Sequence, residues 1–409
     1  MNAKLLGALP LEPVAYRLTN YAYLKLLVAD ESTEVKRGEV KRIGIEPLNL
    51  PQSTISSTLS VISHALGVVL DVHGSAEIEE PKRLVEVSFL PIEDGVVEEG
   101  DLLGVIKVFI LGREPELRMV ENQLFEREIK IVYRTDGELR REKAKVSEMW
   151  YRRWHLAEWC PLIAEQDLTV TKGELELIEI SPMEIPANTI PVPLFIMRNA
   201  CGVVLDLYLR GKPKKIEENR MVSKALFMPV FDGEIRKGDI IGILNIYNVS
   251  VGERSRSLIR YLLKTFKGNL VFWKGERILR KEFEVKPFQF KRSLMGRLEP
   301  LISAENKELK ANEVDTIQIE EIDFPASTIV QPLAGKNHPW GVILDIFSKE
   351  PLRMVEEERK VDHVVFLPYK DLKIKKGEPL GMVNVYHVTV LYEPETFILK
   401  HGGLFPAKL

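Results

Sequence analysis

Short apolar stretches, each bounded by glycine or proline, recur from one end of the chain to the other. Residues 178–186, 202–209, 223–231 and 239–251 are examples, and they are rich in valine, isoleucine, leucine and aromatic residues. Such residues favour strands, and apolar runs of this length between turn residues are typical of buried strands. The pattern therefore predicts a mainly β protein.

Two stretches depart from this pattern, because their apolar residues follow each other at the three and four spacing of an amphipathic helix. They are residues 146–158 (VSEMWYRRWHLAE) and residues 255–265 (SRSLIRYLLKT). We expect a short helix at each, and both lie between repeated parts of the sequence.

One succession of segments occurs three times along the chain. LPQSTI, GVVLD, FLP and EEGDLLGVIKVF in the first copy correspond to IPANTI, GVVLD, FMP and RKGDIIGILNIY in the second, and to FPASTI, GVILD, FLP and KKGEPLGMVNVY in the third. The first proline precedes a glycine by sixteen positions, and an aspartate follows that glycine by four. The prolines are Pro51, Pro186 and Pro325, and the aspartates are Asp71, Asp206 and Asp345. Spacing this regular predicts three similar modules.

The copies are separated by two connectors that each resemble a β-hairpin. Asp136-Gly137 in the first and Lys274-Gly275 in the second suit the tip of a tight turn, and strand-forming residues flank both. The chain is therefore divided into module one (residues 1–114), a connector hairpin (115–158), module two (159–253), a basic connector hairpin (254–297) and module three (298–409).

Composition indicates a folded chain of balanced charge. Of 409 residues, 57 are Lys or Arg and 60 are Asp or Glu, so the formal net charge of -3 gives no general affinity for nucleic acid. Cys160 and Cys201 are too few for a disulfide framework or a four-thiolate zinc site. The N-terminal apolar stretch does not resemble a signal peptide, and no apolar run approaches the roughly 20 residues that span a bilayer. These features predict a cytoplasmic protein with no membrane partner.

The three modules resemble the archaeal domain-of-unknown-function family numbered twenty-two, and this resemblance covers essentially the whole chain. A more distant likeness is to the β-clip fold of the dUTP pyrophosphatases and dCTP deaminases. Their Pro-led segment, Gly-Val-Ile-Asp segment and Gly-Asp-Arg-Ile-Ala-Gln strand have counterparts here in Pro186, in 202–206 and in 238–242. The arginine of the family's Pro-Arg-Ser-Ser segment is absent, so the likeness implies a fold and not a reaction.

The fold class implied by this likeness is mainly β, with three tandem β-clip-like modules and two inserted hairpin connectors. Three such modules in one chain could imitate the trimer that the nucleotide hydrolases build from separate chains, which would place sites between modules. A linear string of three independent modules is the alternative arrangement, and the sequence leaves both open.

The recurring aspartates Asp71, Asp206 and Asp345 lie in apolar strands, where an ionised carboxylate needs a hydrogen-bond donor or a cation to offset desolvation. Such a carboxylate could act as a base toward water, which makes these residues the catalytic candidates. It could equally bond backbone amides and close the following loop. Recurrence in every module favours this structural role, because duplication retains what the fold requires.

Polar residues also recur three positions before the glycine of each GVVLD-type segment. They are His64, Asn199 and His338, which are candidates either for holding a polar ligand or for closing a loop. The histidines of the chain show no paired spacing typical of a metal site, so no metal is predicted.

The last strand of each copy carries another matched set. Asn245 and Asn384 precede Tyr247 and Tyr386 by two positions, and in module one Lys107 precedes an aromatic residue in the same way. An amide beside an aromatic ring could bind a ligand, and packing across the sheet is the alternative interpretation.

The second connector has the strongest local charge. Residues 254–297 contain thirteen basic and three acidic residues, with aromatic rings between them. This composition could contact the phosphates and bases of RNA, and the candidates are Arg277, Arg280, Lys281 and Trp273. A hairpin that pairs with an acidic surface of a neighbouring module explains the charge as well.

No nucleophile motif, phosphate-binding loop or dinucleotide fingerprint is present. The leading hypothesis is therefore a ligand-binding or assembly scaffold, with the ligand, partner and cofactor unspecified. A diverged nucleotide hydrolase with its site between modules and an RNA-associated protein are the two alternatives.

Overall fold

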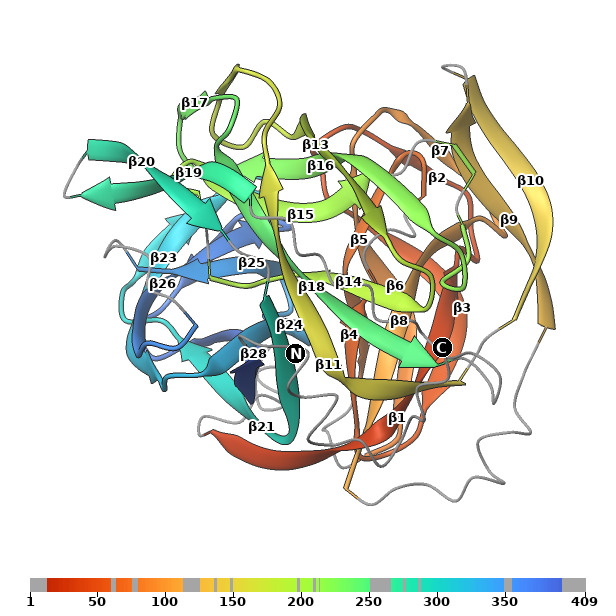
Figure 1. Cartoon of the computed structure of the whole chain (residues 1–409). Coiled ribbons are helices and arrows are strands. Elements are labelled where there is room, and N and C mark those ends of the chain that lie inside the picture. The colour runs from red at the N-terminus through yellow and green to blue at the C-terminus, as the bar shows by residue number, and fades with distance from the viewer. Residues whose placement is uncertain are drawn as a thin grey trace, which may run out of the picture.

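Every regular element in the described part of the chain is a β-strand, as Figure 1 shows, which confirms the mainly β fold class. No helix there is long and apolar enough to cross a membrane. The computed structural model describes residues 13–59, 64–75, 80–112, 126–135, 138–147, 150–196, 199–208, 211–212, 214–250, 266–274, 277–285, 288–348 and 355–391.

The three modules have the same order of eight strands. Module one has β1 (Val14–Val28), β2 (Thr33–Val35), β3 (Lys41–Leu50), β4 (Thr54–Thr58), β5 (Gly67–Ser75), β6 (Lys82–Pro91), β7 (Gly95–Val97) and β8 (Leu102–Leu111). Module two has β11 (Trp150–Ile163), β12 (Leu168–Val170), β13 (Glu176–Ile185), β14 (Thr189–Pro193), β15 (Gly202–Tyr208), β16 (Arg220–Pro229), β17 (Gly233–Ile235) and β18 (Ile240–Ser250). Module three has β21 (Phe288–Ile302), β22 (Lys307–Leu309), β23 (Asp315–Phe324), β24 (Thr328–Asn337), β25 (Gly341–Phe347), β26 (Arg359–Pro368), β27 (Leu372–Ile374) and β28 (Pro379–Leu391).

Each module divides its strands in the same way. In module one, β3, β6 and β5 form a three-stranded sheet, and β2 pairs with β7 in a short ribbon. The remaining strands, β1, β8 and β4, enter a nine-stranded sheet to which all three modules contribute.

The repeated glycine and acidic residue after the ribbon form a tight turn, in which Gly100, Gly238 and Gly377 have φ of 84°, 90° and 82°. Only glycine adopts this backbone conformation without strain.

The two connectors form antiparallel hairpins, as the turn signals predicted. β9 (Glu126–Thr135) pairs with β10 (Glu138–Ser147), and β19 (Phe266–Lys274) pairs with β20 (Arg277–Val285). The helix expected at residues 146–158 is wrong, because β10 ends at Ser147 and β11 continues as a strand. Hydrogen bonding of β11 to three other strands overrides its helical spacing. The helix expected at 255–265 lies outside the described residues.

The long first strands of the modules close a ring. In each of three junctions, the beginning of one strand pairs antiparallel with the middle of another: Val14 with Leu298, Phe288 with Trp159, and Trp150 with Tyr23. Thus β1 joins β21, β21 joins β11, and β11 returns to β1. The same register at every junction makes the chain a pseudo-trimer, with module three beside module one.

Two apolar clusters contain residues of all three modules, and each module also has a core of its own. One of these shared clusters brings together the same positions of three sheets, including Val68, Val203 and Val342, and Leu90, Met228 and Leu367. Inside the modules, Phe89, Phe227 and Phe366 are fully buried against the glycine that begins β5, β15 and β25. A Cβ on those glycines would lie 2.7, 2.8 and 2.2 Å from the phenyl ring, which accounts for the repeated glycine.

Candidate functional site

The recurring aspartates lie where one module meets another. Asp71 of module one accepts hydrogen bonds from the backbone amide of Gly335 and, at 3.0 Å, from the side chain of Asn337, both in module three. Asp345 of module three accepts the backbone amide of Ile196 in module two at 2.7 Å. Gly335 and Ile196 occupy equivalent positions, and both have a positive φ. Each carboxylate therefore binds the backbone of the neighbouring module just after the β4-type pairing.

Asp206 is the third member of this set. Its carboxylate accepts the backbone amide of Leu207 at 2.7 Å, and the residue is buried. The residue equivalent in sequence to Ile196 and Gly335 is residue 61, which lies outside the described residues. For Asp71, burial raises the pKa of the carboxyl to about 6, although its three hydrogen bonds oppose the rise. These carboxylates are thus enclosed between modules.

A second triplicated arrangement involves the polar residues that precede each β5-type strand. His64 Nδ1 accepts the amide of Leu66 at 3.1 Å, so its proton lies on Nε2, which donates to Asp101 at 3.3 Å. Asn199 does the same with an amide group, accepting the Cys201 amide at 2.9 Å and donating to the carbonyl of Ile240 at 3.1 Å. Burial lowers the pKa of His64. These side chains close loops within their own modules.

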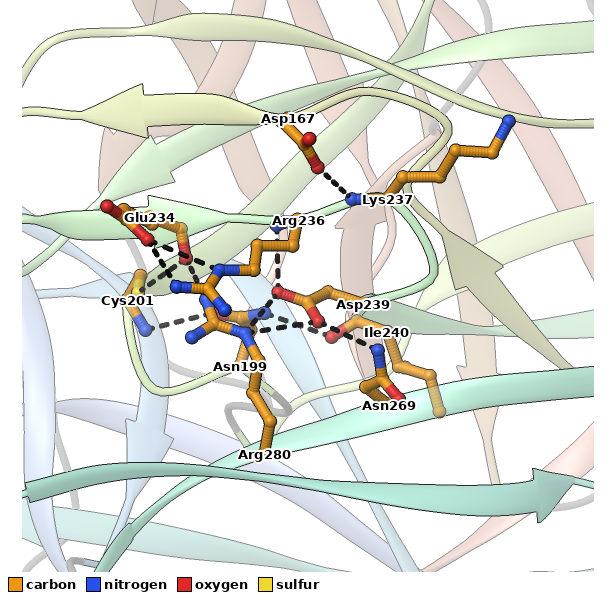
Figure 2. Close-up of polar contacts among 10 residues, drawn as sticks. All are labelled: Asp167, Asn199, Cys201, Glu234, Arg236, Lys237, Asp239, Ile240, Asn269 and Arg280. Carbon is orange, nitrogen blue, oxygen red and sulfur yellow. Dashed lines mark hydrogen bonds and ion pairs between the residues drawn. The ribbon is translucent and has the colours of Figure 1, made fainter.

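Asp101 and Asp239, the acidic residues of the repeated glycine turn, form the centre of a polar cluster in modules one and two. Each accepts the backbone amide three residues earlier, at 2.9 Å in both cases, which closes the turn. Arg141 from β10 places Nε 3.2 Å from Asp101, and Arg280 from β20 places Nε 2.9 Å from Asp239. We call this arrangement the hairpin clasp, and Figure 2 shows it in module two.

Backbone hydrogen bonds complete the clasp. In module one, the Lys130 amide donates to Gly100 at 2.9 Å, and the Ala65 amide donates to Val132 at 3.1 Å. In module two, the corresponding distances are 2.7 Å from Asn269 to Gly238 and 3.0 Å from Ala200 to Val271. The clasp arginine also donates to a ribbon carbonyl, that of Val96 in module one and of Glu234 in module two. Each hairpin thus docks on the module that precedes it.

The clasp accounts for one of the basic residues of the second connector. Arg280 is engaged with Asp239, which is 0% exposed, whereas Arg277 and Lys281 are exposed on β20. The side chain of Trp273 lies outside the described residues. The explanation by pairing with an acidic group thus applies to Arg280, and contact of Arg277 and Lys281 with RNA stays a prediction.

The asparagine and tyrosine candidates belong to the interior of the nine-stranded sheet. The hydroxyls of Tyr247 and Tyr386 contact each other, and Gln331 donates to Tyr247 at 2.7 Å. Asn384 accepts a hydrogen bond from Tyr16. Asn245 is fully buried, and neither polar atom of its side chain has a partner among the described residues. The two tyrosine hydroxyls therefore form hydrogen bonds within the protein interior.

A cavity of about 80 Å³ lies where the three modules converge. Its lining includes Asp206, the hydroxyl residues Ser57 and Thr58, and matching apolar residues of β5, β15 and β25, namely Val69, Val204 and Ile343. Small-molecule sites typically measure about 300–1,000 Å³, so this cavity is too small for a nucleotide. Among the described residues, no three His, Cys, Asp or Glu side chains are grouped as metal ligands would be.

Sequence reasoning did not identify the clasp acids or Arg141. The signal was present, since an acidic residue follows the turn glycine in every copy. What the sequence does not state is which distant segment contacts that acid. Two residues 41 positions apart, Asp239 and Arg280, meet only because the hairpin folds back on its module.

Comparison with known proteins supports the triplication. A family model described as "Domain of unknown function DUF22" matches residues 8–95, 128–233 and 267–372. An uncharacterized protein of Methanocaldococcus jannaschii is 33% identical over 86 residues, which is 21% of this chain and 65% of the archaeal protein. The chain thus spans a little less than two thirds of that relative. No solved structure matches, and the β-clip likeness stays a prediction.

Proposed function

The chain belongs to the family of the domain of unknown function DUF22, of which it carries three copies, and we propose that these copies act as a prebuilt scaffold for assembly with a partner protein. The observation that carries this proposal is the closed ring of β1, β21 and β11. One chain thereby holds three similar modules in a fixed orientation, which separate subunits would provide only by associating.

The environment of the catalytic candidates supports a scaffold over a hydrolase. A general base must reach the proton that it removes, but Asp71 and Asp345 direct an oxygen to a backbone amide of the neighbouring module. The cavity beside Asp206 is about 80 Å³, which is far below the size of a nucleoside triphosphate site. The ring and its carboxylates are thus better suited to holding modules together than to turning over a nucleotide.

A measurement of nucleotide turnover distinguishes the scaffold proposal from the hydrolase alternative. We expect the full chain, incubated with each common ribo- and deoxyribonucleoside triphosphate and with Mg²⁺ or Mn²⁺, to release no more phosphate or pyrophosphate than a protein-free control. Chromatography of the products measures this, with Asp206→Asn as the matched variant. Turnover that requires the cation and disappears in Asp206→Asn would contradict the scaffold and favour the diverged hydrolase.

A further inference from the structure

The hairpin clasp has a third position, in module three, which no strand covers among the described residues. Glu378 stands at the place of Asp101 and Asp239, and it closes its turn by accepting the Lys375 amide at 2.8 Å. The side chain of Glu378 is 18% exposed, whereas those of Asp101 and Asp239 beneath their hairpins are 0% exposed. An acid that an arginine covers in two modules is therefore accessible in the third.

His338 does not replace the missing arginine. Its Nδ1 accepts the backbone amide of Trp340 at 3.2 Å, so Nε2 carries the proton of a neutral ring and donates to Glu378 at 3.2 Å. Burial lowers the pKa of His338 despite this contact. Among the described residues, no arginine or lysine forms an ion pair with Glu378, as Arg141 and Arg280 do with the other two acids.

We propose that this third position binds a β-hairpin of a partner protein that carries an arginine on its second strand. The inference rests on the proposed scaffold function and names the kind of partner that the scaffold holds. The two hairpins of this chain define how the partner hairpin would bind. The first strand of each hairpin forms hydrogen bonds with the module, and one of its residues accepts the module's amide through its carbonyl. The arginine lies on the second strand, directly opposite that residue. Arg141 is opposite Val132, and Arg280 is opposite Val271.

Module three also provides an apolar surface for such a hairpin. In module two, Cys201 packs in one cluster with Ile278 of β20. Trp340 stands at the place of Cys201. The guanidinium of Arg42 and the ammonium of Lys370 lie 5.0 and 3.3 Å from the centroid of its half-buried ring. A hairpin that places an apolar residue where Ile278 lies would cover the remaining indole surface, which stabilises the complex.

Pro339 gives the third position one backbone donor fewer than the other two. At the equivalent positions, Ala65 and Ala200 donate their amides to the docked hairpin. Proline has no N–H, so a hairpin on module three forms one hydrogen bond fewer, which costs about 1 kcal/mol. A second copy of the chain is not the expected partner, because its two hairpins already occupy their own clasps.

A constrained peptide tests the proposal on the full chain. The probe is a synthetic peptide with the sequence of residues 266–285, closed by a disulfide between added terminal cysteines so that its strands stay paired, and labelled for fluorescence anisotropy. We expect saturable binding, and at least tenfold weaker binding of the same peptide with citrulline in place of Arg280. Glu378→Gln in the protein should weaken binding by the same factor, and Glu313→Gln, at an exposed acid of module three, should not.

A variant that binds the peptide more tightly provides a second test, because poor folding cannot explain tighter binding. Pro339→Ala restores the missing donor, and it should tighten binding about fivefold, the factor that corresponds to one hydrogen bond. Absence of saturable binding, equal affinity for the citrulline peptide, or no effect of Glu378→Gln would overturn the inference. Dimerisation of the protein that depends on Glu378, measured by sedimentation, would overturn it in favour of a second copy. None of these results depends on nucleotide turnover, so the turnover experiment tests the scaffold proposal independently of this one.

Discussion

Lys107→Met is expected to raise the free energy of unfolding by about 5 kcal/mol at pH 6. Lys107 on β8 is 2% exposed, and burial lowers the pKa of its ammonium from 10.5 to about 7. The charge of Asp206 opposes this decrease, and that of Arg153 adds to it. Methionine keeps the unbranched stem and removes the charge that the fold must desolvate. Urea unfolding at a series of pH values measures the effect.

The sign of the pH dependence gives this prediction a second check. Because the unfolded chain binds the Lys107 proton more tightly than the folded protein, wild-type stability rises between pH 7 and pH 10.5 from this group. The advantage of Lys107→Met should therefore shrink to near zero at pH 10.5. Lys41→Met, at an exposed lysine of β3, should show no such trend. An advantage of Lys107→Met that is the same at pH 6 and pH 10.5 would mean that Lys107 is not a buried charge.

Arg280→Ala should destabilise the protein by about 3–5 kcal/mol, because it leaves the carboxylate of Asp239 buried without its cation. The ion pair is 2.9 Å long, and the acid is 0% exposed. Arg277→Ala on the same strand removes an exposed charge and should change stability by less than about 0.5 kcal/mol. Urea unfolding gives the free energies, and hydrogen exchange shows whether β19 and β20 open before the modules do.

A double-mutant cycle isolates the interaction itself. Asp239→Asn retains an acceptor for the Arg236 amide and removes the charge that Arg280 neutralises. The combined loss in Arg280→Ala with Asp239→Asn should therefore be smaller than the sum of the two single losses. Additive losses would show that the clasp holds the hairpin by packing alone.

The sequence predicted most of the local structure. The spacing of Pro51, Pro186 and Pro325 relative to later glycines located the same strands in three modules, and the turn signals located both hairpins. The strand β11 was mistaken for a helix at residues 146–158, because a helical spacing of apolar residues does not reveal that neighbouring strands supply the hydrogen bonds.

The contacts between modules were beyond sequence reasoning. Asp71 was recognised as needing a donor, but nothing in the sequence names Gly335, which lies 264 positions away, as that donor. Arg280 was a candidate either for contacting nucleic acid or for pairing with an acidic surface, and only the folded hairpin reveals Asp239 beside it. In both cases the residue type predicted the need for a partner, and tertiary structure selected the partner.

The ring is the central claim, and its closure between the first and third modules distinguishes it from a linear string. Ala15 and Arg297 are partners in the β1–β21 pairing, and neither side chain is buried. Cysteines at directly opposite antiparallel positions, whose Cα atoms are about 4.5–5.5 Å apart, are close enough for a disulfide. The variant Ala15→Cys/Arg297→Cys therefore probes the junction that closes the ring.

Mild oxidation of this variant, followed by mass spectrometry of its unreduced peptides, is the decisive measurement. The ring predicts a disulfide between positions 15 and 297 within a single chain, formed at low protein concentration and absent from each single-cysteine variant. Cys160 and Cys201 are buried and should remain free thiols. Unreacted thiols at positions 15 and 297, or links that form only between chains, would contradict the closed ring.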